Sequence, residues 1–314
     1  MRTAMKRQGL AITVVMMSAA ALLVGSAGTA AAVGTPTGYG AGTTGGGSAS
    51  AVTVTTASAL TSALASSGAK VIRVSGMIAI SGMNDVTSNK TVIGVGSGSG
   101  ITGGGLDVDG ATNVIIQNLN FRNWSDDAIN VQDSSTKIWI DHNSFSNGYD
   151  GAVDIKRGSD FITVSWNKFA NHDKAMLLGH SDSNGSQDRG HLRVSYHHNW
   201  FDGTTQRHPR VRFGNPVHVY NNYYGGVSGY GVASTMEAGV LVEGNYFENT
   251  RDPFHRGEGD SPAGALLARN NHFVNSGGGQ QGGTVKAIPY SYSLDAASTV
   301  KSKVQSGAGT GKVA

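Results

Sequence analysis

The sequence contains no cysteine, so disulfide bonds and thiolate-ligated zinc have no part in its fold or its chemistry. Proline is scarce, at 6 of 314 residues, and the 46 glycines follow no three-residue period, which excludes a collagen-like helix. Charged side chains make up only 14% of the chain. No long apolar run occurs after the first 32 residues, so we expect no membrane span in the rest of the chain.

Residues 1–32 have the pattern of a secretory signal peptide. Arg2, Lys6 and Arg7 precede an uncharged apolar run that begins at Gly9, and Ala30–Ala32 offers a small-residue cleavage site. An uncleaved membrane anchor is the alternative, but the alanine-rich end favours cleavage. We therefore expect a secreted, extracellular protein that is soluble once the signal peptide is removed.

The signal peptide also carries the whole excess of positive charge. Three of the 24 Lys and Arg residues lie in it, which leaves 21 basic and 21 acidic residues in the mature chain. A neutral protein lacks the diffuse basic surface that binds nucleic acid, so we expect no nucleic-acid partner. Since no partner surface is evident in the sequence, we also expect a monomer.

A short motif occurs seven times along the mature chain. It has two apolar positions, a position that is usually asparagine, and an aromatic residue. The aromatic residues are 24, 24, 32, 23, 23 and 26 positions apart, and they are Phe121, Phe145, Phe169, Phe201, Tyr224, Phe247 and Phe273. Two residues before the aromatic, six copies have asparagine and the first copy has Leu119. The apolar residues lie five and seven positions before it, on one face of a strand. A repeat of this length means that each coil of the chain stacks on the next.

The repeat predicts an all-β fold, a right-handed parallel β-helix. A coil of about 23 residues accommodates several short strands but no helix, which argues against ankyrin or leucine-rich arrays. The asparagines would turn the corners and bond to those of neighbouring coils. We expect a short N-terminal capping helix at about residues 58–66 and a tail from about Thr284 that leaves the repeat. An insertion at residues 179–190 is interpreted as a polar surface loop, with Asp182 solvated.

The repeat also aligns charged residues of successive coils. Counted from the aromatic of each repeat, four charges fall at nearly the same position: Asp127, Asp150, Lys174 and Arg207. Asp154 and Arg212 lie a few residues further along their coils. Clustered carboxylates repel one another unless a cation binds, and hard oxygen ligands suit calcium better than zinc. The neighbouring Lys and Arg suit a substrate with several carboxylates, although surface ion pairs without function are the alternative.

Five segments of the sequence point to a known family. They are Trp139–His142, Asp150–Ile155, His172–Lys174, Tyr196–Asn199 and Arg207–Arg212. Together they resemble the successive signatures of the family 1 polysaccharide lyases, the pectate lyases. The similarity runs over nearly the whole mature chain and implies that residues 33–314 form a single parallel β-helix catalytic domain.

The resemblance implies a role for each aligned charge. The matching positions are calcium ligands at Asp127, Asp150 and Asp154, a catalytic base at Arg207, and groups that bind substrate carboxylates at Lys174 and Arg212. Some relatives carry a further acidic ligand where this chain has Ser125, so the number of calcium ions stays open. The implied reaction is a calcium-dependent β-elimination along α-1,4-polygalacturonate, an acidic plant cell-wall polysaccharide, that yields 4,5-unsaturated oligogalacturonides. Because an arginine base must first lose a proton, an alkaline pH optimum is expected.

Three rival interpretations remain. A pectin lyase acts on methyl-esterified substrate, but such relatives place an arginine near the position of Asp154. A polygalacturonase shares the fold and hydrolyses with paired carboxylates. A non-catalytic β-helix would bind polysaccharide without turning it over.

The histidines are interpreted as structural. His197 and His198 are adjacent in a predicted strand, so their side chains should face opposite sides. Asp141 and His142 precede the corner residue Asn143, away from the aligned charges, and are interpreted as supporting the turn.

Overall fold

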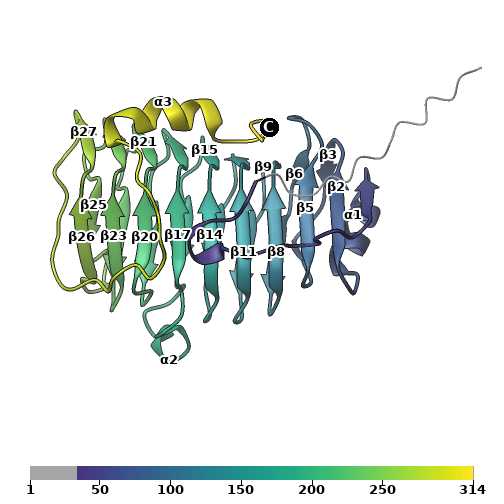
Figure 1. Ribbon diagram of the computed structural model, residues 1–314, viewed down its shortest axis with the longest axis horizontal. Coiled ribbons are helices and arrows are strands. Elements are labelled where there is room, and N and C mark those ends of the chain that lie inside the picture. Colours follow the sequence, from purple (N-terminus) through teal and green to yellow (C-terminus); the bar gives the residue numbers. More distant parts are fainter. Residues whose placement is uncertain (1–33, 314) are drawn as a thin grey trace, which may run out of the picture.

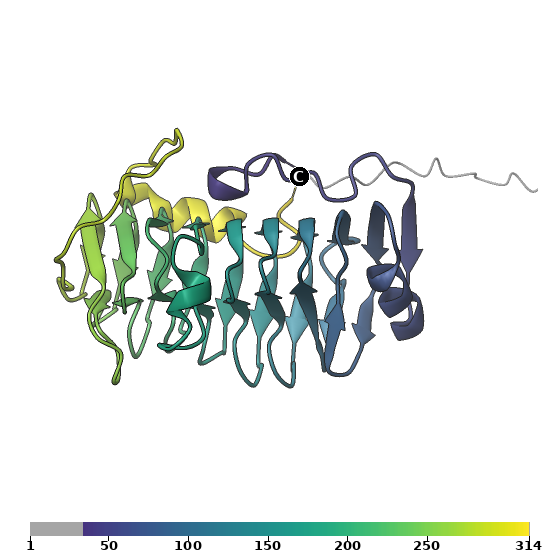
Figure 2. The same cartoon turned by 90° about the horizontal axis from the view of Figure 1, so that it is seen from below.

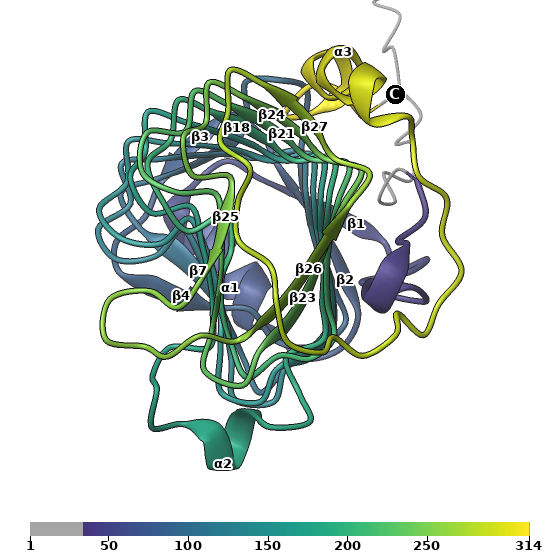
Figure 3. The same cartoon turned by 90° about the vertical axis from the view of Figure 1, so that its left-hand side faces the viewer.

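The computed structural model describes residues 34–313, and their strands stack into the predicted right-handed parallel β-helix (Figure 1). The predicted signal peptide lies outside the described residues. Each coil contributes one strand to each of three parallel sheets, which enclose the core in cross-section (Figure 3). Among residues 34–313, no helix has the length and apolar character needed to cross a membrane.

The three sheets formed by the described residues are named A, B and C. Sheet A runs in the order β1 (Ala51–Val54), β2 (Lys70–Val74), β5 (Lys90–Gly94), β8 (Thr112–Gln117), β11 (Thr136–Asp141), β14 (Asp160–Ser165), β17 (Val194–His197), β20 (Val217–Tyr220), β23 (Gly239–Glu243) and β26 (Ala265–Arg269). Sheet B contains β3 (Met77–Ala79), β6 (Gly100–Thr102), β9 (Asn120–Arg122), β12 (Ser144–Ser146), β15 (Lys168–Ala170), β18 (Trp200–Asp202), β21 (Tyr223–Gly225), β24 (Tyr246–Glu248) and β27 (His272–Val274). Sheet C contains β4 (Met83–Asp85), β7 (Gly105–Asp109), β10 (Ile129–Gln132), β13 (Val153–Ile155), β16 (Met176–Leu178), β19 (Arg210–Arg212), β22 (Val232–Thr235) and β25 (Phe254–Arg256).

The repeated aromatics stack in the core as the sequence predicts. Consecutive rings on sheet B lie 4.4–5.4 Å apart between centroids, from Phe121 to Phe273. The corner asparagines form a ladder, in which the side-chain oxygen of Asn167 accepts from both the backbone and the side chain of Asn143. The first copy joins this ladder through its backbone, because Leu119 N donates to Asn143 Oδ1. This regular stacking fixes the register that brings distant charges together.

Helices cover the N-terminal end of the stack and the outer face of sheet B. Helix α1 (Ala57–Ala65) lies within one residue of its predicted position, is capped by Thr56, and buries Leu60 and Leu64 against the first coil. Helix α3 (Ala297–Gly307), which the sequence analysis did not predict, packs on the outside of sheet B through Val300 and Val304 (Figure 1).

The N-terminal segment crosses the outer face of sheet A and includes the short 3-10 helix η1 (Gly38–Gly40). Figure 2 shows this segment and α3 lying along the outside of the stack. The insertion at residues 179–190 holds helix α2 (Gly185–Asp188) and hangs from the corner between sheets C and A (Figure 3). The outer face of sheet C therefore has this insertion at one margin.

Candidate active site on the outer face of sheet C

A row of outward-facing residues crosses sheet C in strand register. It contains Asp85, Asp107, Asn130, Asp154, Leu177 and Arg210, on β4, β7, β10, β13, β16 and β19 respectively. The row is acidic toward the N-terminal coils and basic toward the C-terminal coils. Parallel strands lie about 4.8 Å apart, so Asp154 and Arg210 are separated by about 10 Å along it.

Beside this row, three of the four aligned charges meet at the connections that lead into sheet C. Lys174 Nζ lies 3.1 Å from Asp150 Oδ1, and Arg207 Nη1 lies 3.6 Å from the same oxygen. The backbone of Asp150 donates to the carbonyl of Asp126, which places Asp127 one coil away from it. The alignment from sequence thus brings Asp127, Asp150, Lys174 and Arg207 to one place.

Two of the carboxylates at this place, Asp127 and Asp154, are buried and receive few hydrogen bonds. Asp154 is 5% exposed and its Oδ1 accepts one hydrogen bond, from Leu177 N. Burial and, next, the negative charge of Asp127 raise its pKa well above the usual value, and the cations Arg207 and Lys156 offset this only in part. Burial also raises the pKa of Asp127 to about 6, which the nearby Lys156 only partly offsets. Both carboxylates would be stabilised as anions by a bound cation.

The backbone at Gly151 leaves room for the Asp154 side chain. A side chain at Gly151 would collide with the Asp154 carboxylate, which occupies the space above that glycine. Asp127, Asp150 and Asp154 provide hard oxygen donors, as calcium requires. Among residues 34–313, no three acidic or histidine side chains converge closely enough to enclose a metal ion by themselves. Any ion held here would need substrate or water for the rest of its coordination shell.

Arg212 lies apart from this cluster. Its Nε donates to Asp182 Oδ1 at 2.5 Å, and its Nη1 donates to the carbonyl of Gly179. Asp182 also accepts from Ser261 Oγ at 2.8 Å. Asp182 lies in a surface loop with its side chain 40% exposed, as the sequence predicts. Its ion pair with Arg212 on β19 was not predicted.

Two cations of the site were missed in the sequence. Lys156 Nζ lies 3.8 Å from Asp127 Oδ2, and Arg210 lies in the row across sheet C. Both follow the strand alternation, since Lys156 is two residues after Asp154 and Arg210 is two residues before Arg212. Applying that alternation on sheet C would have found them.

Known proteins resemble this chain over most of its length. A family model described as pectate lyase matches residues 10–313. The chain is 38% identical over 251 residues to a probable pectate lyase A from Aspergillus flavus, covering 77% of this chain and 76% of that protein. It is 42% identical over 142 residues to a pectate trisaccharide-lyase from Bacillus licheniformis, covering 45% of this chain and 40% of that protein.

Solved structures agree with these matches. The crystal structure of pectate lyase Bsp165PelA from Bacillus sp. N165 in complex with trigalacturonate superposes with a TM-score of 0.82 at 32% identity, covering 89% of this chain and 100% of that chain. The chain belongs to the pectate lyase family. The predicted family, the β-helix fold and the enzyme class, a polysaccharide lyase, are confirmed.

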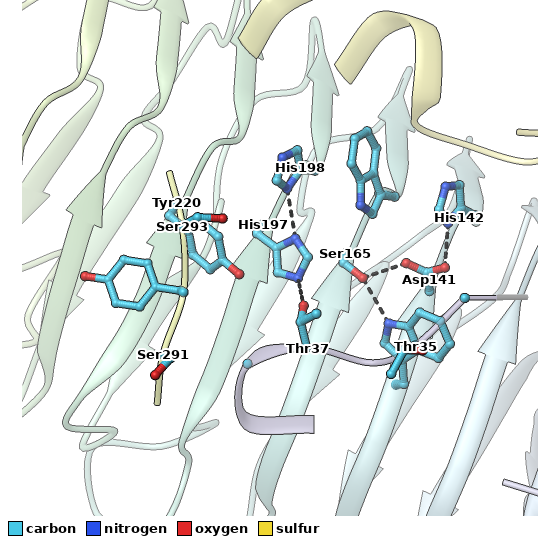
Figure 4. A pocket seen from close by; sticks show the side chains of 15 residues that line it. Thr35, Thr37, Asp141, His142, Ser165, His197, His198, Tyr220, Ser291 and Ser293 are labelled. Atoms are coloured by element: carbon cyan, nitrogen blue, oxygen red, sulfur yellow. Dashed lines mark hydrogen bonds and ion pairs between the residues drawn. The ribbon is translucent and has the colours of Figure 1, made fainter. Parts of the chain in front are cut away.

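This lyase also has a cavity on the outer face of sheet A, away from the charges of sheet C. The cavity of about 470 Å³ lies between the N-terminal segment and residues 291–293, and its walls include Trp139, Trp166 and Tyr220 (Figure 4). Its charged groups are paired. Asp141 accepts from Gln117, Ser165 and His142, which supports the interpretation of Asp141 and His142 as part of the turn.

The expectation that His197 and His198 face opposite sides was wrong. Strand β17 ends at His197, and His198 is a corner residue with a positive φ of 55°. The chain therefore turns between them, and their Nδ1 atoms lie 2.9 Å apart beside the same cavity (Figure 4). Burial lowers the pKa of His197 well below the usual value, so its ring is neutral and serves as a hydrogen-bonded wall.

Proposed function

We propose that the charges on sheet C cleave α-1,4-polygalacturonate by calcium-dependent β-elimination and release 4,5-unsaturated oligogalacturonides. The observation that carries this proposal is the meeting of Asp150, Lys174 and Arg207 beside the buried carboxylates Asp127 and Asp154. The trigalacturonate complex of a relative at 32% identity supports an acidic galacturonate chain as the substrate.

In this proposal Asp127, Asp150 and Asp154 hold calcium. When bound there, the ion would neutralise substrate carboxylates and withdraw charge from the sugar, which acidifies its C5–H bond. The buried and poorly compensated carboxylates supply a reason for binding the ion, because its charge removes their mutual repulsion. The number of calcium ions bound is to be determined by measurement.

Arg207 is proposed as the base that removes the C5 proton. The electron pair of that bond shifts toward the neighbouring carboxylate and then expels the oxygen at C4. A double bond is left between C4 and C5, and the departing oxygen takes up a proton from water. Lys174 would bind the substrate carboxylate and share the negative charge that develops on it. Arg212 would contribute through Nη2, since its Nε and Nη1 already bond to Asp182 and Gly179.

Competing functions give different results in one assay. The protein is incubated with polygalacturonate, with and without EDTA, and the ultraviolet absorbance of the unsaturated product is followed. We expect product only when calcium is available, and calcium added back in excess should restore it. Full activity in EDTA would contradict the calcium-dependent mechanism and favour a pectin-lyase type. Reducing ends without absorbance would indicate hydrolysis, and binding without turnover would indicate a non-catalytic β-helix.

We also propose that the enzyme is secreted and acts as a monomer. Residues 1–32 carry the signal-peptide pattern on which secretion rests. N-terminal sequencing of protein recovered from the medium should begin near residue 33, and an N-terminus at Met1 would contradict cleavage. Light scattering of the same material tests the monomer.

A further inference from the structure

Arg210 is a cation of sheet C to which the proposed function gives no role. One of its terminal nitrogens, Nη2, donates to the carbonyl of Glu258 at 3.0 Å and to Ser261 Oγ at 2.9 Å. Its Nε is buried and has no hydrogen-bond partner. Within residues 34–313, no carboxylate lies within ion-pair distance of its guanidinium. Its side chain is therefore positioned by neutral groups while its charge lacks a counterion.

Arg212, two residues further along β19, differs in this respect. Its guanidinium is bonded to Asp182, and only 8% of the residue is exposed. Ser261 joins the two arginines, because its hydroxyl accepts from Arg210 and donates to Asp182. The insertion and the loop after β25 thus neutralise Arg212 and hold Arg210 in place.

The electrostatic surroundings of Arg210 are those of an incomplete anion site. Burial, followed by the positive charge of Arg212, lowers its pKa, and Arg207 adds to this repulsion. Glu258 attracts it from a distance, but the carboxylate of Glu258 lies 3.0 Å from His255 Nε2. An anion that arrived at Arg210 would meet a partly buried cation whose Nε has no partner, where charged hydrogen bonds are strong.

The position of Arg210 matches the substrate proposed above. It lies in strand register with Asp154, two strands away, and only Leu177 stands between them on the outer face. A chain with a carboxylate on every sugar that crossed from the calcium ligands toward β19 would bring one of its carboxylates to Arg210.

We propose that Arg210 binds a carboxylate of the acidic polysaccharide on the C-terminal side of the calcium ligands, and is a further substrate-binding and specificity-determining residue. This rests on the proposed function. Its guanidinium is held by Ser261 and the Glu258 carbonyl, while the Nε of Arg212 is already paired with Asp182. Arg210 therefore favours free galacturonate over its methyl ester at that position.

The kinetic test uses Arg210→Gln and Arg210→Lys with polygalacturonate as substrate. Loss of a charge-assisted hydrogen bond should raise KM about 10- to 100-fold for Arg210→Gln, with kcat changed much less. Arg210→Lys keeps the charge and should recover part of the loss. The matched control is Arg122→Gln, which removes the same charge from an exposed position on β9 of sheet B. Equal KM values for Arg210→Gln and Arg122→Gln would overturn the proposal.

A binding measurement separates this proposal from the proposed function. Calorimetry with calcium compares hexagalacturonate with its methyl ester on the inactive Arg207→Gln protein and on the Arg207→Gln/Arg210→Gln double variant, so that the ligand is not cleaved during the measurement. We expect the double variant to lose about 10-fold or more in affinity for the acid and to keep its affinity for the ester. Equal losses for both ligands would show a merely structural role and overturn the proposal. A wild type that binds hexagalacturonate without forming unsaturated product would contradict the proposed function alone.

Discussion

The outer faces of sheets A and C are built from the same coils but treat buried charge in opposite ways. On sheet A, Asp141 receives hydrogen bonds from Gln117, Ser165 and His142, and Glu243 receives them from His218 and Arg269. On sheet C, Asp154 has a single backbone donor and its pKa is raised well above the usual value. The two faces have the same parallel strand arrangement. They differ in how many hydrogen bonds their buried carboxylates receive from the protein.

This difference separates a structural cavity from a site prepared for a ligand. The cavity on sheet A is well formed, yet its Asp and His side chains bond to one another and to the segments that cover them. The face of sheet C has a buried carboxylate, Asp154, with one hydrogen-bond donor, and an arginine, Arg210, with a buried Nε that has no partner. Buried charge without a partner is costly, and a bound cation and an acidic substrate would remove that cost.

Replacement of Arg207 on the face of sheet C should lower kcat far more than replacement of a paired arginine on sheet A. We expect Arg207→Gln to lower kcat on polygalacturonate about 1000-fold, the size typical of losing a general base. The matched variant Arg193→Gln removes an arginine that pairs with Asp160 at the start of β14, and should leave kcat within a few fold. A rate loss of the same size in both variants would contradict the assignment of Arg207.

On the face of sheet A, removal of a paired charge should instead affect stability. Asp141→Asn keeps the size of the side chain but disrupts the bonds to His142 and Ser165, so we expect the free energy of unfolding to fall by about 3 kcal/mol. Denaturant titration measures this loss. The folded fraction should retain its activity, and a large drop in kcat without a change in stability would assign catalysis to this face.

The pH dependence of stability gives a smaller effect on the same face. Burial alone would raise the pKa of Glu243, but hydrogen bonds from His218 and Arg269 outweigh it and lower the pKa to about 2. The stabilisation is therefore fully present above about pH 4.5 and is lost as the pH falls toward 2. We expect a loss of about 2 kcal/mol over this window. Glu243→Gln should flatten that part of the stability profile, and an unchanged profile would contradict the pairing.

The sequence alone predicted the register of the coils and the position of most of the aligned charges. Phe121 to Phe273 set the period, and that period carried Asp150, Lys174 and Arg207 to one place because parallel coils transmit register without drift. The capping helix was found within one residue because Thr56, Leu60 and Leu64 follow general helix rules.

The errors and omissions arose where the chain leaves the repeat. The position of Asp182 against Arg212 depends on how the insertion folds back, and no spacing in the repeat encodes that. Helix α3 was missed because its signal is only Val300 and Val304, one turn apart, within a polar tail. His198 was misplaced because alternation was extended one residue past the end of β17, into a corner with positive φ.

The most direct test of the account is the melting temperature of Asp154→Asn, measured with and without calcium at one alkaline pH. Without calcium, loss of a buried charge that Arg207 and Lys156 compensate only in part should raise the melting temperature by about 2–4 °C relative to the wild type. Calcium should then stabilise the wild type and leave the variant unchanged. A variant that melts lower without calcium and still gains stability from the ion would contradict the claim that unbalanced charge on sheet C prepares the site.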